Sequence, residues 1–317
     1  MTSRESLKKI LLFSLIALII VPVSIVHAQM NLLDKKDVII IFDEGLKDAA
    51  EKAAGLYPGI KADLERTFGW KIDFEPGIIL IKDHNTFQKM SGNMLIVAYA
   101  LPDDSVMVID YSKMLTDPFT LEATIKHELC HLLLHNKTAS VNLPRWLDEG
   151  VAQWASGGLA DIVMAKRSIL DEAFRQDRLI GLKYLSEGFP SDDYSLMLAY
   201  AEGRSFVEYL ARENGPQGII DLLNRLKDGD EIEEAITKAY SRSFSELEAG
   251  WVNDLGKSTV WISILINNLY EIIFFLAAAA LVLGFLRVRR RKRRYWEDEG
   301  GTEDTDSIVH KGKKTDD

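Results

Sequence analysis

The sequence of 317 residues predicts an α+β fold in which a small mixed sheet lobe is followed by a mainly helical lobe, with one transmembrane helix near the C-terminus. Three observations support this fold class. Short runs rich in β-branched residues occur only up to Ile109. Amphipathic helical patterns fill the chain from Phe119 to Gly256. A long apolar block that ends in a basic run lies beyond them.

The predicted sheet has four strands. Val38–Phe42 is a continuous apolar run of the kind that forms a buried strand, and Ile78–Ile81 is a second. Met94–Ala100 and Val106–Ile109 are two more, joined by a turn-prone segment. A helical pattern over Gly45–Phe68 separates the first two strands. No internal repeat occurs, and no low-complexity linker separates the strand-rich part from the helical part. We therefore interpret residues 29–258 as two lobes of one domain.

The N-terminal segment, residues 1–28, has the features of a signal peptide. Lys8 and Lys9 precede the apolar run Ile10–Val21, and Val26-His27-Ala28 ends in the small residue that signal peptidase accepts. The alternative is an uncleaved anchor, because apolar residues continue to Val26. This stretch is short for a membrane span of about 20 residues, which favours cleavage.

The C-terminal apolar block, residues 260–286, is predicted to be a transmembrane helix. It stops at a run of seven cations between Arg287 and Arg294, as a stop-transfer helix does. The positive-inside rule then predicts a single-pass protein of the cell membrane, with its C-terminus in the cytoplasm and residues 29–258 on the extracytoplasmic side. A nuclear-localisation or nucleic-acid signal is the less favoured interpretation of the basic run. The rest of residues 287–317 is acidic and predicted to be disordered.

Charge and cysteine content restrict the class of protein further. The formal net charge is −10, and most of the acidic excess lies in residues 29–258, so we expect no nucleic-acid partner. Cys130 is the only cysteine, which excludes an internal disulfide.

The clearest chemical motif is His127-Glu128-Leu129-Cys130-His131. The two histidines are one helical turn apart on the helical stretch Leu121–His135, so both imidazoles lie on one face, as two of the three protein ligands of a catalytic zinc do. Glu128 can reach the water on such a metal and act as its general base. The alternative is a helix whose two histidines only face solvent, and a chance match is expected at about one percent.

A third ligand is offered by Glu149, which lies 18 positions after His131 where a new helical pattern begins. A loop and a helical turn of that length can bring its carboxylate back to the first helix. Its setting, Trp146-Leu147-Asp148-Glu149-Gly150, resembles that of the third ligand in the peptidase MA-like domain of the gluzincin zinc metallopeptidases, the thermolysin-like clan. The resemblance implies one Zn²⁺ ion held by His127, His131 and Glu149. Gly150 is expected to let its helix pack closely against the zinc helix.

The resemblance covers about residues 75–255 and implies two further features. The strand Val106–Ile109, with Met94–Tyr99 beside it, corresponds to the edge strand that binds substrate in such peptidases. Tyr200 is the candidate for stabilising the oxyanion, although an aromatic residue on a helix is as often part of the core. No signature separates an endopeptidase from an aminopeptidase.

Two residues in or near the motif, His135 and Cys130, are alternative candidates for a metal ligand. His135 lies on the same helical face, but it is about 12 Å along the axis from His127, so the three histidines cannot share one ion. We expect His135 behind the ligands or at the surface, and the presence of Lys137 excludes the metzincin spacing. Cys130 points about 100° away from the metal face and is predicted to be a buried core thiol. His84 is assigned no role.

Together these features predict a membrane-anchored zinc-dependent metallopeptidase that hydrolyses peptide bonds of a peptide or protein substrate with a metal-activated water and Glu128 as base. The alternative is a catalytically silent peptidase-like module that binds peptides or senses envelope state, against which the presence of Glu128 counts. A structural membrane protein with a chance motif is the third interpretation.

Overall fold

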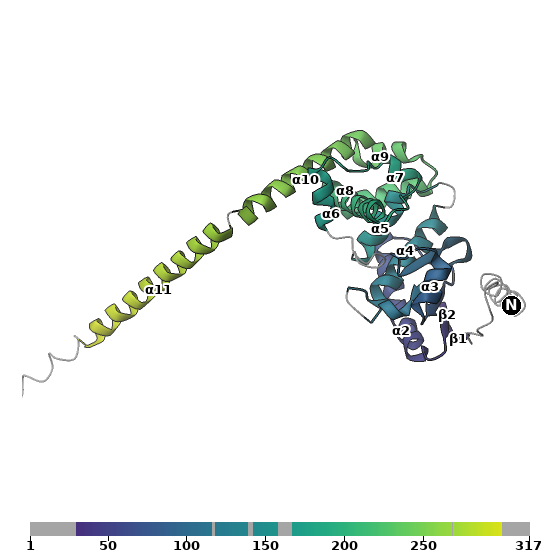
Figure 1. Cartoon of the computed structure of the whole chain (residues 1–317), viewed down its shortest axis with the longest axis horizontal. Helices are drawn as coiled ribbons and strands as arrows, with labels where there is room; N and C mark the ends of the chain where they lie inside the picture. The colour runs from purple at the N-terminus through teal and green to yellow at the C-terminus, as the bar shows by residue number, and fades with distance from the viewer. Residues whose placement is uncertain (1–29, 116–117, 139–141, 158–166, 268, 300–317) are drawn as a thin grey trace, which may run out of the picture. The chain divides into compact units, whose positions relative to one another are not determined.

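The computed structural model describes residues 30–115, 118–138, 142–157, 167–267 and 269–299 (Figure 1). Side chains of residues 167–168, 258–272 and 291–299 are not described. The predicted signal peptide, residues 1–28, lies outside the described residues. The chain divides into two compact units, with the boundary between Val252 and Asn253.

The first unit begins with a five-stranded mixed sheet of order β1-β2-β3-β5-β4. Strands β2, β3 and β5 run parallel, and β1 and β4 pair antiparallel at the two edges. The predicted small mixed sheet is therefore confirmed. The strands are β1 (Met30–Lys35), β2 (Val38–Asp43), β3 (Gly77–Ile81), β4 (Ala98–Leu101) and β5 (Val106–Asp110).

Strand β1 was not predicted from the sequence, and β4 is shorter than predicted. Most of β1 is exposed, including Leu32, so it carries no apolar run that would reveal it. It forms a hairpin with β2 in which Lys35 pairs with Val38. The predicted strand Met94–Ala100 is reduced to its C-terminal part, and β4 begins at Ala98.

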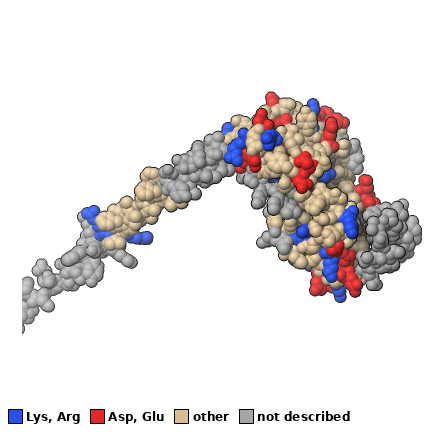
Figure 2. Space-filling view, viewed as in Figure 1, with Lys and Arg blue, Asp and Glu red and all other residues tan. Residues whose placement is uncertain are grey.

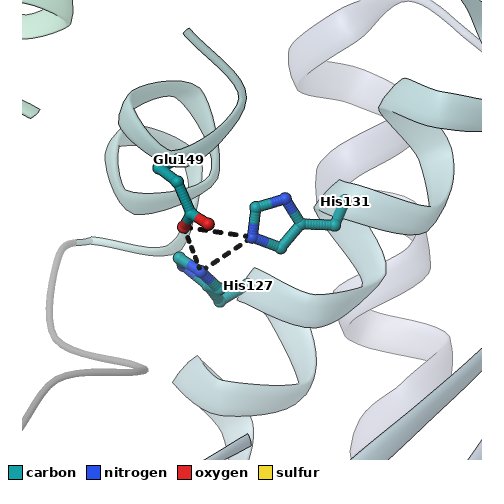
Figure 3. A group of neighbouring side chains, drawn as sticks. All are labelled: His127, His131 and Glu149. Carbon is teal, nitrogen blue, oxygen red and sulfur yellow. Dashed lines mark hydrogen bonds and ion pairs between the residues drawn. The ribbon is translucent and has the colours of Figure 1, made fainter. Parts of the chain in front are cut away.

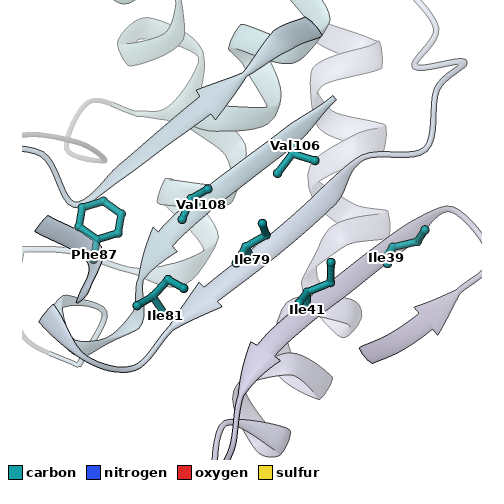
Figure 4. Close-up of a cluster of buried hydrophobic side chains, with 7 residues drawn as sticks. All are labelled: Ile39, Ile41, Ile79, Ile81, Phe87, Val106 and Val108. Carbon is teal, nitrogen blue, oxygen red and sulfur yellow. The ribbon is translucent and has the colours of Figure 1, made fainter. Parts of the chain in front are cut away.

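Both faces of the sheet are covered. Seven buried side chains form a cluster on one face, with Phe87 of α3 (His84–Ser91) packed over the strands (Figure 4). Side chains alternate between the two faces along a strand. The buried residues that alternate with the cluster residues in β2, β3 and β5 therefore point to the opposite face. There α2 (Lys47–Phe68) and α4 (Leu121–Lys137) pack against the sheet. The clustered residues are Ile39, Ile41, Ile79, Ile81, Phe87, Val106 and Val108.

The part of the first unit that follows α4 is helical, as predicted, and contains no strand among its described residues. Its core is a group of aromatic rings in which Phe206 contacts Trp146 and Trp251, with centroid distances of 5.1 and 5.8 Å. The longest helix is kinked at Asn214 and Gly215, just before Pro216. The helices are α5 (Arg145–Ser156), α6 (Arg167–Arg175), α7 (Tyr184–Glu187), α8 (Asp193–Lys227), α9 (Ile232–Tyr240) and α10 (Phe244–Asn267).

A buried carboxyl ties the segment after α6 to α8. The carboxyl of Glu202 is inaccessible to solvent and accepts a hydrogen bond of 2.8 Å from the backbone N–H of Ile180. Two residues on, the N–H of Leu182 donates to Glu248 of α10 at 2.9 Å. Burial raises the pKa of Glu202 to about 7. The backbone after α6 is therefore anchored to two helices.

The contact between α5 and α8 depends on two glycines. A Cβ on Gly150 would lie 2.6 Å from the carbonyl oxygen of Gly203 and 2.6 Å from Val207 Cγ2. A Cβ on Gly203 would lie 2.9 Å from the carbonyl oxygen of Trp146. The prediction that Gly150 allows packing against the helix of the histidine motif is wrong, because the atoms that crowd it belong to α8. The sequence spacing alone does not reveal which helix approaches this glycine.

The second unit contains the C-terminal part of α10 and α11 (Leu269–Glu299). The predicted transmembrane segment, residues 260–286, covers the end of α10 and part of α11, and its residue 268 and the side chains of residues 260–272 lie outside what the structure describes. Over the part of the chain that is described, no helix has the length and apolar character needed to cross a membrane. Helix α11 continues past residue 287, where a disordered tail was predicted, because arginine, lysine and glutamate are good helix formers.

Replacing Gly150 by alanine tests the close packing of α5 on α8. The added methyl group overlaps backbone and side-chain atoms of α8, so we expect Gly150→Ala to lower the free energy of unfolding by about 1–3 kcal/mol. Gly55→Ala is the control, because a Cβ there meets nothing within 4 Å in helix α2, and it should stabilise by about 0.4–1 kcal/mol. Urea unfolding measures both, and equal effects of the two substitutions would contradict the packing argument.

Candidate active site

The histidine motif lies on a buried helix. Helix α4 starts at Thr120, whose hydroxyl accepts a hydrogen bond from the backbone N–H of Ala123 and so satisfies an N–H that has no partner within the helix. His127 is completely buried and His131 nearly so. Their rings are one turn apart with centroids 4.7 Å from each other. The predicted placement of both imidazoles on one face of one helix is therefore what the structure shows.

Glu149 approaches the histidines from α5, which begins after Pro144. Its Oε2 lies 3.8 Å from Nε2 of His127 and 3.5 Å from Nε2 of His131. The two Nε2 atoms are 3.1 Å apart. The three side chains point toward one another in Figure 3, His127 and His131 from one helix and Glu149 from another. The structure thus brings together the three residues predicted as metal ligands.

The spacing of these atoms fits one metal ion. Ligands bound tetrahedrally to zinc at about 2.0–2.2 Å lie about 3.3–3.5 Å from each other, close to the three distances observed. Two imidazole nitrogens and a carboxylate oxygen are also a donor set that zinc prefers. Oε2 of Glu149 is buried and accepts no hydrogen bond from a described residue, although it faces both imidazoles. A divalent cation would satisfy this oxygen.

Asp148 holds His131 in place from behind. Nδ1 of His131 lies 2.8 Å from Oδ1 of Asp148, so a proton on Nδ1 leaves the lone pair of Nε2 directed at His127 and Glu149. Oδ2 of Asp148 accepts a second hydrogen bond of 3.0 Å from Nε2 of His135. His135 is half-exposed and lies behind the ligands, as predicted. This role of Asp148 was not predicted from the sequence, although an acid beside a ligand is a possible signal.

The electrostatics of the site keep the carboxylates charged. Burial acts to raise the pKa of Glu149, but His131, His127 and Arg145 outweigh it and hold the pKa well below its usual range. Burial acts to lower the pKa of His131, but the negative charges of Asp148 and Glu149 outweigh burial and raise this pKa well above its usual value. A negative charge on Glu149 is the form that binds metal. The site is therefore suited to a cation, whether a proton or a metal ion.

An open cavity of about 820 Å³ reaches two of the three predicted ligands and the predicted base. Glu128, His131 and Glu149 line its floor. One wall comes from the sheet part of the unit, residues 91–100 and Pro102, and the other from residues 187–200 of the helical part. The cavity thus lies where the two parts of the first unit meet.

The edge strand beside this cavity is β4, and the prediction for Val106–Ile109 is wrong. Strand β5 lies between β3 and β4 and is hydrogen-bonded on both sides. Residues Ala98–Ala100 of β4 line the cavity, and β4 pairs only with β5 among the described strands. Strand order is set by pairing across the sheet, which the order of strands along the chain does not reveal.

Tyr200, the predicted oxyanion residue, lines the same cavity. It is nearly buried on α8, where it packs with Leu196, and its ring meets that of Phe189 edge-on at 4.9 Å. Its hydroxyl is among the groups that raise the pKa of Arg145. Tyr200 is therefore both part of a small apolar cluster and placed at the cavity that holds Glu128.

The remaining candidates lie away from the metal-binding atoms or in the core. Cys130 is fully buried, and burial raises the pKa of its thiol to about 12, which agrees with the predicted core thiol. No role was predicted for His84. It is the first residue of α3, and its Nδ1 forms a hydrogen bond of 2.5 Å with Oδ2 of Asp110, the last residue of β5.

Comparison with known protein families supports this assignment of residues to one domain. A family model described as the peptidase MA superfamily matches residues 85–257, which is more than half of the chain. This range includes His127, Glu128, His131, Glu149 and Tyr200. No curated protein matches the chain.

Replacing Asp148 by asparagine tests how His131 is held. Because the carboxylate fixes the tautomer of His131 and an amide does so poorly, we expect Asp148→Asn to weaken Zn²⁺ binding about 10–100-fold. Competition with a chromophoric chelator measures the affinity. Asp193→Asn, a change at another carboxylate that lines the cavity, should leave the affinity within about twofold of wild type. Equal affinities of Asp148→Asn and wild type would refute the role of Asp148.

Proposed function

Because the chain belongs to the peptidase MA superfamily, we propose that it is a zinc-dependent metallopeptidase of the gluzincin type. The observation that carries this proposal is the convergence of His127, His131 and Glu149 beside a cavity that His131, Glu149 and the predicted base Glu128 line. Two imidazoles and one carboxylate leave a position for water, which is the arrangement of a catalytic rather than a structural zinc site.

The chemistry of this site follows from the placement of its residues. A zinc ion bound there would supply a polarised water with a lowered pKa. The carboxylate of Glu128 takes the proton from the attacking water and later gives it to the nitrogen of the leaving amine. The hydroxyl of Tyr200 donates a hydrogen bond to the oxygen that becomes negative as the peptide carbon turns tetrahedral. Burial of Glu128 excludes bulk water from this proton transfer.

The edge of β4 is the proposed binding site for the substrate backbone. An extended peptide can add to a free strand edge through main-chain hydrogen bonds. Residues Ala98–Ala100 line the same cavity as Glu128, His131 and Glu149, so a peptide paired with β4 would lie beside them. This supports a peptide or an unfolded protein segment as substrate.

Membrane attachment is proposed from the C-terminal segment. In α11 the large apolar side chains between Ile273 and Val288 are exposed, and arginines follow them (Figure 2). Such a helix is stabilised when lipid covers it, and the basic run favours the cytoplasmic side. With a signal peptide at residues 1–28, the catalytic domain would lie on the extracytoplasmic side of the cell membrane.

The Glu128→Gln variant of the full chain tests the proposed reaction. The amide keeps the shape of the side chain but cannot accept the proton, so we expect hydrolysis of a broad peptide library to fall by about 10²–10⁴-fold. Bound zinc, measured by metal analysis, should stay near one ion per chain in both proteins. Glu122→Gln is the matched control, an exposed glutamate in the first turn of the same helix, and should retain full activity.

Two other outcomes would reject the proposal in different ways. Zinc bound without any Glu128-dependent cleavage would favour the catalytically silent module that binds peptides. Absence of zinc from both the wild type and the variant, after incubation with excess metal, would reject the metal site itself.

A further inference from the structure

Arg145 reaches the metal-binding carboxylate from the cavity side. It is one helical turn before Glu149 on α5, and its Nη2 forms an ion pair with Oε1 of Glu149 at 2.6 Å. The other oxygen, Oε2, is the one that faces His127 and His131. Arg145 therefore occupies one oxygen of Glu149 and leaves the second for the metal.

The same guanidinium also contacts α8 and the segment before it. It lies over the ring of Phe189, 5.8 Å from the ring centroid, and that ring packs edge-on against Tyr200. Tyr200 lines the same cavity, and its hydroxyl is among the groups that raise the pKa of Arg145. About half of the side chain of Arg145 remains exposed, and it lines the cavity. One side chain thus connects the third ligand on α5 with the tyrosine on α8.

We propose that Arg145 is a positioning residue that holds Glu149 with a single oxygen toward the metal and holds the hydroxyl of Tyr200 at the cavity. This inference rests on the proposed function, because it assigns a role within the same site. It gives Arg145 no contact with the reacting bond.

The shape of the guanidinium makes arginine specific for this role. Its planar fork presents donors in fixed directions, so one group can bind a carboxylate oxygen and a hydroxyl together. A lysine ammonium supplies the charge beside Glu149 from a flexible stem, without the fixed directions that reach Tyr200 as well. Lysine should therefore restore the contact with Glu149 and not the contact with Tyr200.

A simple helical ion pair is the alternative explanation of the contact with Glu149. Arg204 and Glu208 form such a pair on α8, with the same spacing along the helix and a distance of 2.8 Å. Neither residue lines the cavity, and both are partly exposed. Arg204→Met is therefore a matched control that removes an arginine from the same kind of pair.

The test compares Arg145→Met, Arg145→Lys, Tyr200→Phe and the double variant Arg145→Met/Tyr200→Phe in the full chain, with Arg204→Met as control. Arg145→Met should weaken Zn²⁺ affinity about 10–100-fold, as expected for a residue that orients a ligand. Arg145→Lys should keep an affinity within about threefold of wild type and show the lower kcat of Tyr200→Phe. With zinc bound, the double variant should have the kcat of Tyr200→Phe, with KM unchanged, because Arg145 acts on kcat through the hydroxyl that Tyr200→Phe removes.

Wild-type zinc affinity in Arg145→Met would overturn the inference, and so would losses in kcat that multiply in the double variant. If Arg145→Met does not fold, Arg145→Lys decides: the inference requires that it keeps the zinc affinity of wild type and loses kcat. A wild-type chain that binds zinc but cleaves no peptide would reject the proposed function alone. The zinc affinity of Arg145→Met would then still decide whether Arg145 orients Glu149.

Discussion

The burial of Glu149 against two imidazoles is the constraint on which the rest of the site depends. A carboxylate taken out of water is stable only if other groups replace its hydration. Arg145 satisfies one of its oxygens, and the other faces His127 and His131. The same cost explains Asp148, which is buried beside it and accepts hydrogen bonds from His131 and His135. The polar residues around the site are thus the condition for placing a metal-binding carboxylate inside the protein.

The backbone arrangement that permits this burial is the close approach of α5 and α8. Gly150 follows Glu149 directly, and Gly203 lies three residues after Tyr200. Contact between these two glycines therefore fixes the position of a metal ligand on one helix and of the candidate oxyanion residue on the other. The aromatic core around Trp146 and Phe206 holds the same two helices together. Packing and chemistry depend on the same crossing point.

The parts of the fold that the sequence predicted correctly are those set by local patterns. Strands β2, β3 and β5 are continuous apolar runs, and the spacing of His127 and His131 places both on one helical face. Glu149 was recognised through its resemblance to known peptidases rather than through spacing. Strand β1 was not predicted because it is mostly exposed, so no apolar pattern marks it.

What the sequence could not predict are contacts between elements. The position of β4 at the edge of the sheet depends on strand pairing, and the partner of Gly150 depends on which helix crosses it. Arg145 and Asp148 lie within five residues of Glu149 in the chain, but their roles depend on side-chain directions toward α8 and α4. Those directions are set by the packing of α5 between the two helices.

The central claim is that one zinc ion is bound by His127, His131 and Glu149. Anomalous diffraction at the zinc absorption edge, from crystals of the full chain with bound zinc, tests it most directly. The account predicts a single peak at about 2.0–2.2 Å from Nε2 of both histidines and from Oε2 of Glu149. A peak bound instead through His135 or Asp148, or no peak at these three residues in zinc-saturated crystals, would contradict it.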